Sequence, residues 1–296
     1  MSDYVLTCSS VADLPREYTE ANDIGVLPFR FLLDGKEYLD DQGQSMSYKE
    51  FYDRMRDGAM PSTTMVNTEQ YKDFFRPYLE KGLDILHIEF SSGLSGTFQS
   101  ARLAASQLEE EFPDRKIHIV DSRGATVAYG LGVILTKQKM NEGASFDEAT
   151  EYAEEICRKC MHWFVVEQLD TLRRGGRLSR ASAMLGTVLN IKPLLSVDGD
   201  GVIIPVEKIR GRKKSLAALV NKFAENIVDP DGQIAIVMHA DSPDDAAWVA
   251  EEAKRQVPTL GEVRIYNLGP VIGAHTGPGS VGITALGPER QETPES

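Results

Sequence analysis

Short apolar runs alternate with longer amphipathic segments along the first half of the chain, and this pattern indicates strands alternating with helices. The apolar runs are short enough for buried strands, and the segments between them repeat apolar residues at helical spacing. The expected strands are residues 4–8, 24–29, 84–90 and 116–120, and the expected helices are residues 48–56, 68–80, 94–111 and 125–140. Such alternation is typical of an α/β protein with mainly parallel strands.

The second half shows the same alternation with different turn residues. The expected strands are residues 162–167, 192–197, 202–209, 234–240 and 262–268, and the expected helices are residues 146–160, 214–227 and 243–256. Several helix starts carry capping signals. Ser47 and Ser145 each precede a glutamate by three positions, as in a capping box, and Ser242 precedes Pro243 as an expected cap.

The length of the chain favours two domains, because 296 residues is near the size at which single hydrophobic cores stop growing. We expect an N-terminal α/β domain at residues 1–160 and a C-terminal α/β domain at residues 161–286, both with mainly parallel sheets. The polar residues 287–296 are expected to form a flexible tail. No linker rich in Pro, Gly or Ser separates the domains, so they are expected to pack tightly around a ligand cleft.

The charge of the chain argues against nucleic-acid binding. It has 32 Lys and Arg against 45 Asp and Glu, a formal charge of −13, whereas nucleic-acid binding depends on neutralising phosphates. Two basic clusters, residues 173–180 and 208–214, are either solvated surface or a site for an anion or a partner. No apolar run approaches the length of about 20 residues that spans a bilayer, and no signal peptide pattern is found. We expect a cytoplasmic protein without stable membrane insertion.

The cysteines do not predict a metal or redox site. Cys157 and Cys160 form a C-x-x-C pair, but this pair ends an expected helix and no second ligand pair accompanies it. We therefore expect two helix cysteines, no metal and no cofactor.

The segment SSGLSGTFQSA, residues 91–101, places hydroxyl side chains and two glycines between an expected strand and an expected helix. Ligands of open α/β sheets bind beyond the carboxyl ends of strands. The free N–H groups of a helix start attract anions, and glycine allows close backbone approach. Ser95, Gly96 and Thr97 are therefore candidate donors to a carboxylate or phosphate. The alternative is that they only cap the helix.

Three further segments carry groups suited to an anion. Thr63 and Thr64 lie in PSTTMVN, ahead of an expected helix. His275 and Thr276 lie in GPVIGAHTGPGSVGI, which has more turn residues than a connection needs, so His275 is the best ligand candidate among the five histidines. RRGGR, residues 173–177, adds fixed positive charge beside two glycines.

Common nucleotide and hydrolase motifs are absent or out of context. GPGSVG, residues 277–282, matches G-x-G-x-x-G, but too little chain follows for a βαβ unit. The chain has no P-loop motif, and GLSGT is not the G-x-S-x-G elbow of a hydrolase.

Taken together, SSGLSGTFQSA, PSTTMVN, RRGGRLS, NIKPLLSV and GPVIGAHTGPGSVG resemble the DegV family of bacterial fatty-acid-binding proteins over nearly the whole chain. The resemblance implies two α/β domains that hold one long-chain fatty acid, with its carboxylate between the domains and its acyl chain in an apolar tunnel. It also implies a non-catalytic lipid carrier, which in some bacteria presents the acid to a separate fatty acid kinase.

The same resemblance assigns the residues that bind the carboxylate. The family threonine falls on Thr63, the serine of the glycine-rich turn on Ser95 with the adjacent Gly96 amide, and the C-terminal histidine on His275. Thr276, which follows the histidine, is included with them.

Possible contacts to the head group or to a partner are Thr64, Thr97, Arg174 and Arg177. The resemblance places the family arginine on Arg174, with Arg177 beside it. The chain has TTMVN where the family usually has Thr-Ser-Gln-Pro-Ser, and Ala274 where it has threonine. These departures keep the donors and alter the local loops.

Two other functions stay open. Ser95 and His275 could serve as nucleophile and base of a hydrolase or acyltransferase, although no acid is assignable to orient the histidine. The same donors would suit a small polar anion. An apolar tunnel would distinguish a lipid carrier from both. Residues 188–191 are a guess for its lining, and residues 208–214 are the surface expected to meet a kinase.

Overall fold

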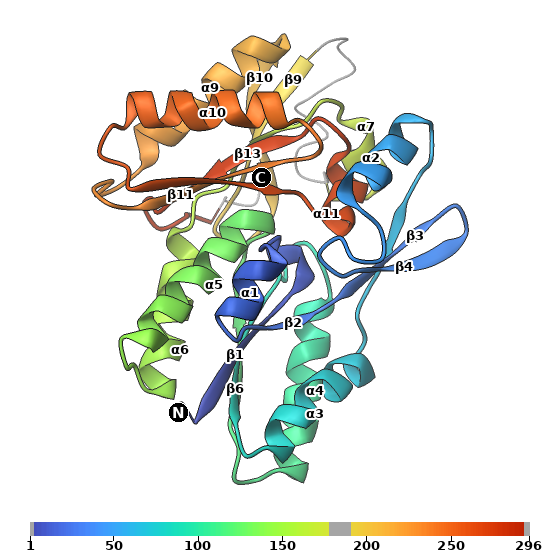
Figure 1. The fold of residues 1–296 in the computed structure, drawn as a ribbon, viewed down its shortest axis with the longest axis vertical. Helices are drawn as coiled ribbons and strands as arrows, with labels where there is room; N and C mark the ends of the chain where they lie inside the picture. The colour runs from blue at the N-terminus through green and yellow to red at the C-terminus, as the bar shows by residue number, and fades with distance from the viewer. Residues whose placement is uncertain (1–2, 178–190, 293–296) are drawn as a thin grey trace.

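The computed structural model describes residues 3–177 and 191–292, and its first half is built on a four-stranded sheet. The order is β2-β1-β6-β7, and every neighbouring pair is parallel. The strands are β1 (Tyr4–Ser9), β2 (Gly25–Leu27), β6 (Asp84–Glu89) and β7 (Ile117–Asp121). Helices α3 (Thr68–Glu80) and α4 (Thr97–Glu111) pack on one face and α6 (Phe146–Lys159) on the other (Figure 1). The α/β class expected from the alternation is confirmed.

The second half is built on a six-stranded sheet with the order β10-β9-β8-β13-β11-β12. Its strands are β8 (Trp163–Val165), β9 (Ile191–Val197), β10 (Ile203–Arg210), β11 (Ile234–His239), β12 (Glu262–Asn267) and β13 (Val281–Thr284). Within this sheet β11 and β12 pair in parallel, and the other four neighbouring pairs are antiparallel. The expectation of a mainly parallel sheet is therefore wrong for this half. A short turn folds β9 and β10 into a hairpin, and β13, which the sequence pattern missed, enters between β8 and β11 in the opposite direction.

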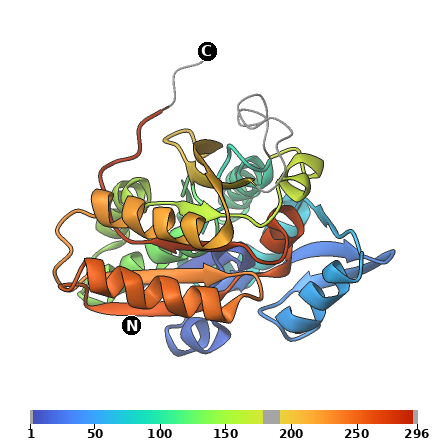
Figure 2. The same cartoon turned by 90° about the horizontal axis from the view of Figure 1, so that it is seen from above.

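Helix α5 (Thr126–Asn141) lies between the two sheets. It packs against α6 and η1 (Ser10–Ala12) on one side and against β11 and β13 on the other. Most of its side chains are buried, as in a helix enclosed on all sides. Helices α9 (Arg212–Asn226) and α10 (Pro243–Gln256) cover the opposite face of the six-stranded sheet (Figure 2). One large cluster of buried apolar side chains includes residues of both halves, and the division into domains at residue 160 stays a prediction.

A small antiparallel sheet, β4-β3-β5, lies beside α2 (Tyr48–Arg56) (Figure 1). Its strands are β3 (Phe29–Leu33), β4 (Lys36–Asp40) and β5 (Ser62–Thr64). This sheet was not predicted from the sequence pattern. Its signal was readable, because Asp34 and Gly35 form a two-residue turn with φ of 52° and 76°, the backbone that an Asp-Gly hairpin requires.

Three short helices were also missed. They are α1 (Arg16–Ala21), α7 (Asp170–Arg174) and α11 (Pro270–Thr276). Helix α11 occupies part of the segment in which turn residues predicted a loop. Pro270 takes its first position, which needs no N–H donor, and Gly277 ends it with a φ of 79°.

Two of the three predicted caps are present. The Ser47 oxygen accepts the N–H of Glu50 at 3.2 Å, and Ser145 takes part in a complete capping box. Ser242 differs from the expectation, because its side chain makes no cap hydrogen bond. Its own N–H donates to Nδ1 of His239 at 3.2 Å instead.

The segment expected to be a flexible tail is tied to the fold as far as residue 292. The N–H of Gly287 donates to the carbonyl of Lys159 at 2.9 Å, and the N–H of Gly199 donates to the carbonyl of Gln291 at 2.8 Å. The side chain of Arg290 donates to four backbone carbonyls. Residues 293–296 lie outside the described residues.

Candidate functional site

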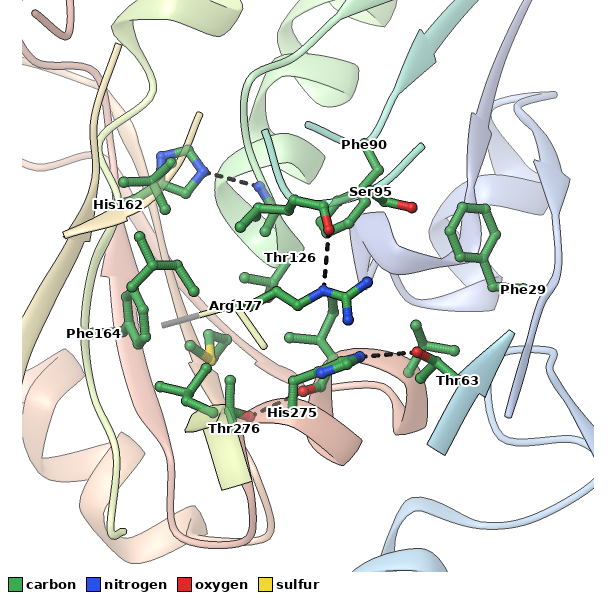
Figure 3. Close-up of a pocket in the computed structure, with 18 of the residues that line it drawn as sticks. Phe29, Thr63, Phe90, Ser95, Thr126, His162, Phe164, Arg177, His275 and Thr276 are labelled. Atoms are coloured by element: carbon green, nitrogen blue, oxygen red, sulfur yellow. Dashed lines mark hydrogen bonds between the residues drawn. The ribbon is translucent and has the colours of Figure 1, made fainter. Parts of the chain in front are cut away.

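A cavity lies between the first sheet, the six-stranded sheet and the small sheet (Figure 3). It has about 1000 Å³ of space outside the protein atoms, its open mouth included. Its walls are mostly apolar and include Phe29, Phe90, Leu94, Phe164, Leu172, Val197, Ile203, Met238, Val271 and Ile272. Arg177, His275, Thr63 and Ser95 lie near one another, whereas His162 lies beside Phe164 and Phe29 lies beyond Thr63 (Figure 3). The cavity wall is therefore mostly apolar, and the part formed by Thr63, Ser95, Arg177 and His275 is called its polar end.

Thr63 and His275 form a direct contact at the polar end, although 212 positions separate them in the chain. Thr63 Oγ1 and His275 Nε2 are 2.9 Å apart. Strand β5 carries Thr63 and pairs with β3, and α11, which carries His275, packs on both strands. The small sheet and α11 together hold the two side chains in the cavity wall.

His275 offers hydrogen bonding rather than charge. Burial, and then the charge of Arg177, lowers the pKa of His275 to about 4. The imidazole is therefore neutral at neutral pH, with one nitrogen as donor and the other as acceptor. Its Nδ1 is buried without a hydrogen-bond partner and lies against Gly175, where any Cβ would collide with the ring. Gly175 thus makes room for His275.

Arg177 supplies the positive charge at the polar end. Its Nε donates to the carbonyl of Leu94 at 3.2 Å, and its Nη1 donates to the carbonyl of Gly175 at 2.5 Å. A guanidinium has five N–H donors, so these two bonds fix the group and leave donors for an anion. No other Lys or Arg occurs among the lining residues of the described chain.

Arg174, which the resemblance matched to the family arginine, lies elsewhere. It ends α7, and its Nη1 is 3.5 Å from Sδ of Met60. It is not among the described residues that line the cavity. Of the two arginines, Arg177 lines the cavity and Arg174 does not.

The turn before α4 contributes Ser95 to the cavity. The Ser95 side-chain oxygen accepts the N–H of Thr97 at 3.3 Å. Gly96 is the N-cap residue of α4, and a Cβ there would lie 2.8 Å from Sδ of Met65. Thr97 is fully buried inside the fold. Neither Gly96 nor Thr97 is among the described lining residues, so the structure brings only Ser95 of the three to the site.

The remaining hydroxyl candidates, Thr64 and Thr276, both line the cavity. The hydroxyl of Thr276 donates to the carbonyl of Ile272 at 3.2 Å within α11. Thr64 follows Thr63 on β5. Their positions agree with the sequence prediction, and their roles stay predictions.

Ser91 and Gly93 have a function that the sequence analysis missed. The hydroxyl of Ser91 donates to the carbonyl of Gly201 at 2.8 Å, in the turn between β9 and β10. A Cβ at Gly93 would lie 2.6 Å from the carbonyl oxygen of Asp200. The first part of the serine-rich turn, Ser91 to Gly93, therefore contacts the second half of the chain, and Leu94 and Ser95 line the cavity. This double use explains why the turn is crowded with small and hydroxyl residues.

His162 is a further buried group in the cavity wall that the sequence did not indicate (Figure 3). Its Nε2 accepts the N–H of Ala125 at 3.1 Å, so its Nδ1 carries the hydrogen and donates to the carbonyl of Cys160 at 3.1 Å. Burial and the charge of Arg290 keep its pKa well below the usual value. His162 is therefore neutral and already satisfied, which suits a wall that faces an apolar ligand.

The guess for the tunnel lining at residues 188–191 finds no support. Residues 188–190 lie outside the described residues. Ile191 begins β9 and is not among the described lining residues.

The arrangement differs from that of a serine hydrolase. Within the described chain, His275 Nε2 pairs with Thr63 rather than Ser95, and its Nδ1 has no carboxylate partner.

Residues 3–177 and 191–292 contain no group of three or more His, Cys, Asp or Glu side chains that could hold a metal ion. Cys157 and Cys160 are free and buried. No helix in the same ranges is both long and apolar enough to cross a membrane.

Fold and site together define a class: an α/β protein with an apolar cavity that carries one guanidinium, hydroxyls and a neutral imidazole at one end. Comparison with known proteins agrees. The family model of the DegV family, described as uncharacterised proteins, matches residues 5–287. The chain belongs to the DegV family, as the sequence motifs predicted.

Individual relatives cover nearly the whole chain. A DegV domain-containing protein of Clostridium perfringens is 38% identical over 291 residues, which is 98% of this chain and 100% of that protein. A DegV family protein of Thermus thermophilus, described for fatty acid binding, is 31% identical, with a TM-score of 0.86 over 96% of this chain and 99% of that one. A stearic acid-binding protein of Eubacterium ventriosum is 27% identical, with a TM-score of 0.86 over 96% and 98% of the two chains.

Proposed function

We propose that this protein binds one long-chain fatty acid without chemical conversion, with the acyl chain in the apolar part of the cavity and the carboxylate at the polar end. The proposal rests on how apolar and polar side chains are distributed in the cavity wall. Aromatic and aliphatic side chains form most of it, and Thr63, Ser95, Arg177 and His275 lie together at one end. A small polar anion would leave the apolar wall without a partner.

The acyl chain supplies most of the binding free energy. Burial of each methylene is worth about 0.8 kcal/mol, so about fourteen methylenes contribute about 11 kcal/mol before the cost of association. Each hydrogen bond to the carboxylate adds about 1.5 to 3 kcal/mol. The polar end therefore fixes the orientation of the ligand and prevents the cost of an unpaired buried charge.

Each polar residue has a distinct part in holding the carboxylate. Arg177 provides the counter-charge, and its guanidinium is already oriented by two backbone carbonyls. Thr63 and Ser95 provide hydroxyl donors. Neutral His275 donates its Nε2–H to Thr63 Oγ1, which leaves the Thr63 hydroxyl hydrogen for the carboxylate. The Thermus and Eubacterium relatives, which are described as fatty-acid-binding proteins, support fatty acid as the ligand.

Native mass spectrometry of the freshly purified protein tests the proposal. We expect one bound fatty acid per chain, identified after denaturation and lipid extraction. The matched control is Arg177→Gln, in which we expect a smaller bound fraction. A protein that is empty as purified and that also fails to bind added oleate and palmitate would contradict the proposal and favour a polar anion as the ligand.

We further propose that the protein presents the carboxylate to a fatty acid kinase. The mouth of the cavity supports this, because Met65 lines it and is 58% exposed. Of the basic residues expected to meet a kinase, Arg212 is paired with Asp245. The others are exposed: Lys208, Arg210, Lys213 and Lys214. The predicted cytoplasmic location and the predicted lack of a cofactor stay predictions.

Kinase turnover with the purified kinase tests this role. Replacing Lys213 and Lys214 by alanine should lower the rate of acyl phosphate formation without changing fatty acid affinity. Lys254→Ala, which removes an exposed lysine from α10, should leave the rate unchanged. Equal rates for all variants would exclude this surface as the docking site.

A further inference from the structure

Two buried carboxylates from the first half of the chain hold the start of α11. Asp13 follows η1 and is 6% exposed, and Asp40 ends β4 and is 2% exposed. Asp13 Oδ1 accepts the N–H of Gly269 at 2.9 Å, and Asp40 Oδ2 accepts the N–H of Val271 at 3.4 Å. A Cβ at Gly269 would lie 2.6 Å from Asp13 Oδ1 and 3.1 Å from Asp40 Oδ2. Both carboxylates therefore lie close to Gly269, and the site has no room for a side chain there.

Helix α11 connects this acid pair to the polar end of the cavity. The Tyr52 hydroxyl donates to the carbonyl of Leu268 at 2.9 Å and lies directly against Gly273. The far end of the helix carries His275 and Thr276, which line the cavity. Because α11 has only 7 residues, it is about 10 Å long, and a shift at its start is carried to His275.

The charges around the pair favour a bound proton. Burial raises the pKa of Asp40 to about 7, and burial together with the charge of Asp40 raises the pKa of Asp13 well above its usual range. The Thr126 hydroxyl interacts with Asp13 and the Ser10 hydroxyl with Asp40, and both interactions oppose the rise in pKa without cancelling it. The titratable groups that interact with the pair are Asp41, Tyr48 and Tyr52. Arg16 and Glu17 line a surface pocket together with Asp13, and Asp241 interacts with Tyr52. Arg16 itself is bonded to Glu20 and Gln44.

We propose that Asp13 and Asp40 share one proton at the start of α11 and act as positioning residues for His275 and Thr276. When that proton leaves, two carboxylates face each other around Gly269, and their repulsion loosens the hold on the helix. The cavity then binds its ligand less tightly, although neither acid touches the ligand. This inference rests on the proposed function, because it uses a fatty acid as the probe.

Asp40→Asn is the central test, because an amide keeps an acceptor for the N–H of Val271 and can donate to Asp13, as a protonated acid does. Oleate affinity is measured below its micelle concentration from about pH 6 to about pH 8.5. In this window His275 is already neutral and the ligand carboxyl is already ionised. We expect equal affinities at the low end. At the high end, wild type should be weaker by about threefold or more, and Asp40→Asn should be unchanged.

A second readout needs no ligand. The imidazole resonances of His275 are followed by NMR and assigned from the signal that His275→Gln removes. Across the same window, where His275 does not titrate, its resonances should shift in wild type and stay constant in Asp40→Asn. Asp114→Asn, which removes an exposed acid between α4 and β7, should keep the wild-type profile.

The outcomes separate the two proposals. If wild type binds no oleate, the proposed function fails, and the His275 resonances still test the positioning role. If wild type binds oleate but its affinity and its His275 resonances are constant with pH, or if Asp40→Asn keeps the wild-type profile, the positioning role is overturned. Asp13→Asn keeps the acceptor for Gly269 and should also remove the pH dependence, which provides a second variant if Asp40→Asn does not fold.

Discussion

The two halves of the chain meet at two junctions that use opposite charges. At the start of α11, Asp13 and Asp40 accept N–H groups of the backbone. At the junction beside the serine-rich turn, the guanidinium of Arg290 donates to carbonyls of the backbone. Its acceptors belong to Ser122, Arg123, Cys157 and Asp198. Both junctions pair backbone groups that burial would otherwise leave unsatisfied.

The two junctions differ in how they respond to pH. A guanidinium stays charged in proteins, even though burial lowers the pKa of Arg290. Asp40 has a pKa of about 7 and changes charge near neutrality. The charge at the Arg290 junction therefore does not change with pH, and we call it the permanent junction. The charge at the Asp13–Asp40 junction changes near neutrality, and we call it the adjustable junction. The cavity lies between them, with Ser95 near the permanent junction and His275 on the helix of the adjustable one.

The largest effect on stability should come from Arg290→Ala, at the permanent junction. This variant removes a donor from four backbone carbonyls, and within the described chain only that of Asp198 keeps a second donor, the N–H of Gly201. We therefore expect a loss of about 3 to 5 kcal/mol in the free energy of unfolding. Denaturant unfolding at pH 7 measures it. Arg290→Lys keeps the charge but loses the planar guanidinium, so its free energy of unfolding should lie between those of wild type and Arg290→Ala. A loss below about 1 kcal/mol would mean that the tail does not join the halves.

Arg177→Gln should have the next largest effect, but on binding. Removal of the counter-charge that Arg177 supplies, the one Lys or Arg among the described lining residues, should weaken fatty acid binding by about ten- to a hundredfold, which corresponds to about 1.5 to 3 kcal/mol. Titration with oleate measures this change. Arg174→Gln is the matched control and should bind nearly as wild type, because Arg174 lies outside the described lining. Equal losses of affinity in both variants would mean that both arginines, rather than Arg177 alone, contribute to carboxylate binding.

The pH dependence of stability separates the two junctions directly. Because the pKa of Asp40 is raised in the fold, its stabilising contribution is complete below its unfolded pKa of about 4 and is lost as pH rises through about 7. Between pH 6 and pH 8 wild type should lose about 1.4 kcal/mol relative to Asp40→Asn. Unfolding curves at both pH values provide the difference, and Arg290→Lys should keep the wild-type slope. A wild-type slope in Asp40→Asn would show that another group titrates.

The sequence predicted those features of the fold that depend on local pattern. Apolar periodicity located most of the helices and strands, and the motif around Thr63 and His275 pointed to residues that do meet in the cavity wall. The Asp34-Gly35 turn was equally readable and was missed. The direction of the strands in the second sheet was not readable, because it depends on β13 returning between β8 and β11, and this pairing is long-range.

The rest of the site depends on contacts between distant segments. Arg177, rather than Arg174, reaches the cavity because of how α7 packs beside α11. Asp13 and Asp40 are ordinary turn and strand-end residues in the sequence, and only the approach of α11 buries them as a pair. Burial and charge proximity of this kind cannot be obtained from residue order alone.

The smallest effect should come from Ser91→Ala, which removes the hydrogen bond to Gly201 at the permanent junction and a local one from the N–H of Gly93. Ser91 is fully buried, and its hydroxyl donates to the carbonyl of Gly201 at 2.8 Å. We expect a loss of about 0.5 to 1.5 kcal/mol in the free energy of unfolding. The loss should be the same at pH 6 and pH 8, because neither partner titrates. Ser92→Ala, at the exposed neighbouring position, should change little. A pH-dependent loss in Ser91→Ala would mean that the acid pair and the serine-rich turn are coupled through the cavity, and that the two junctions are not independent.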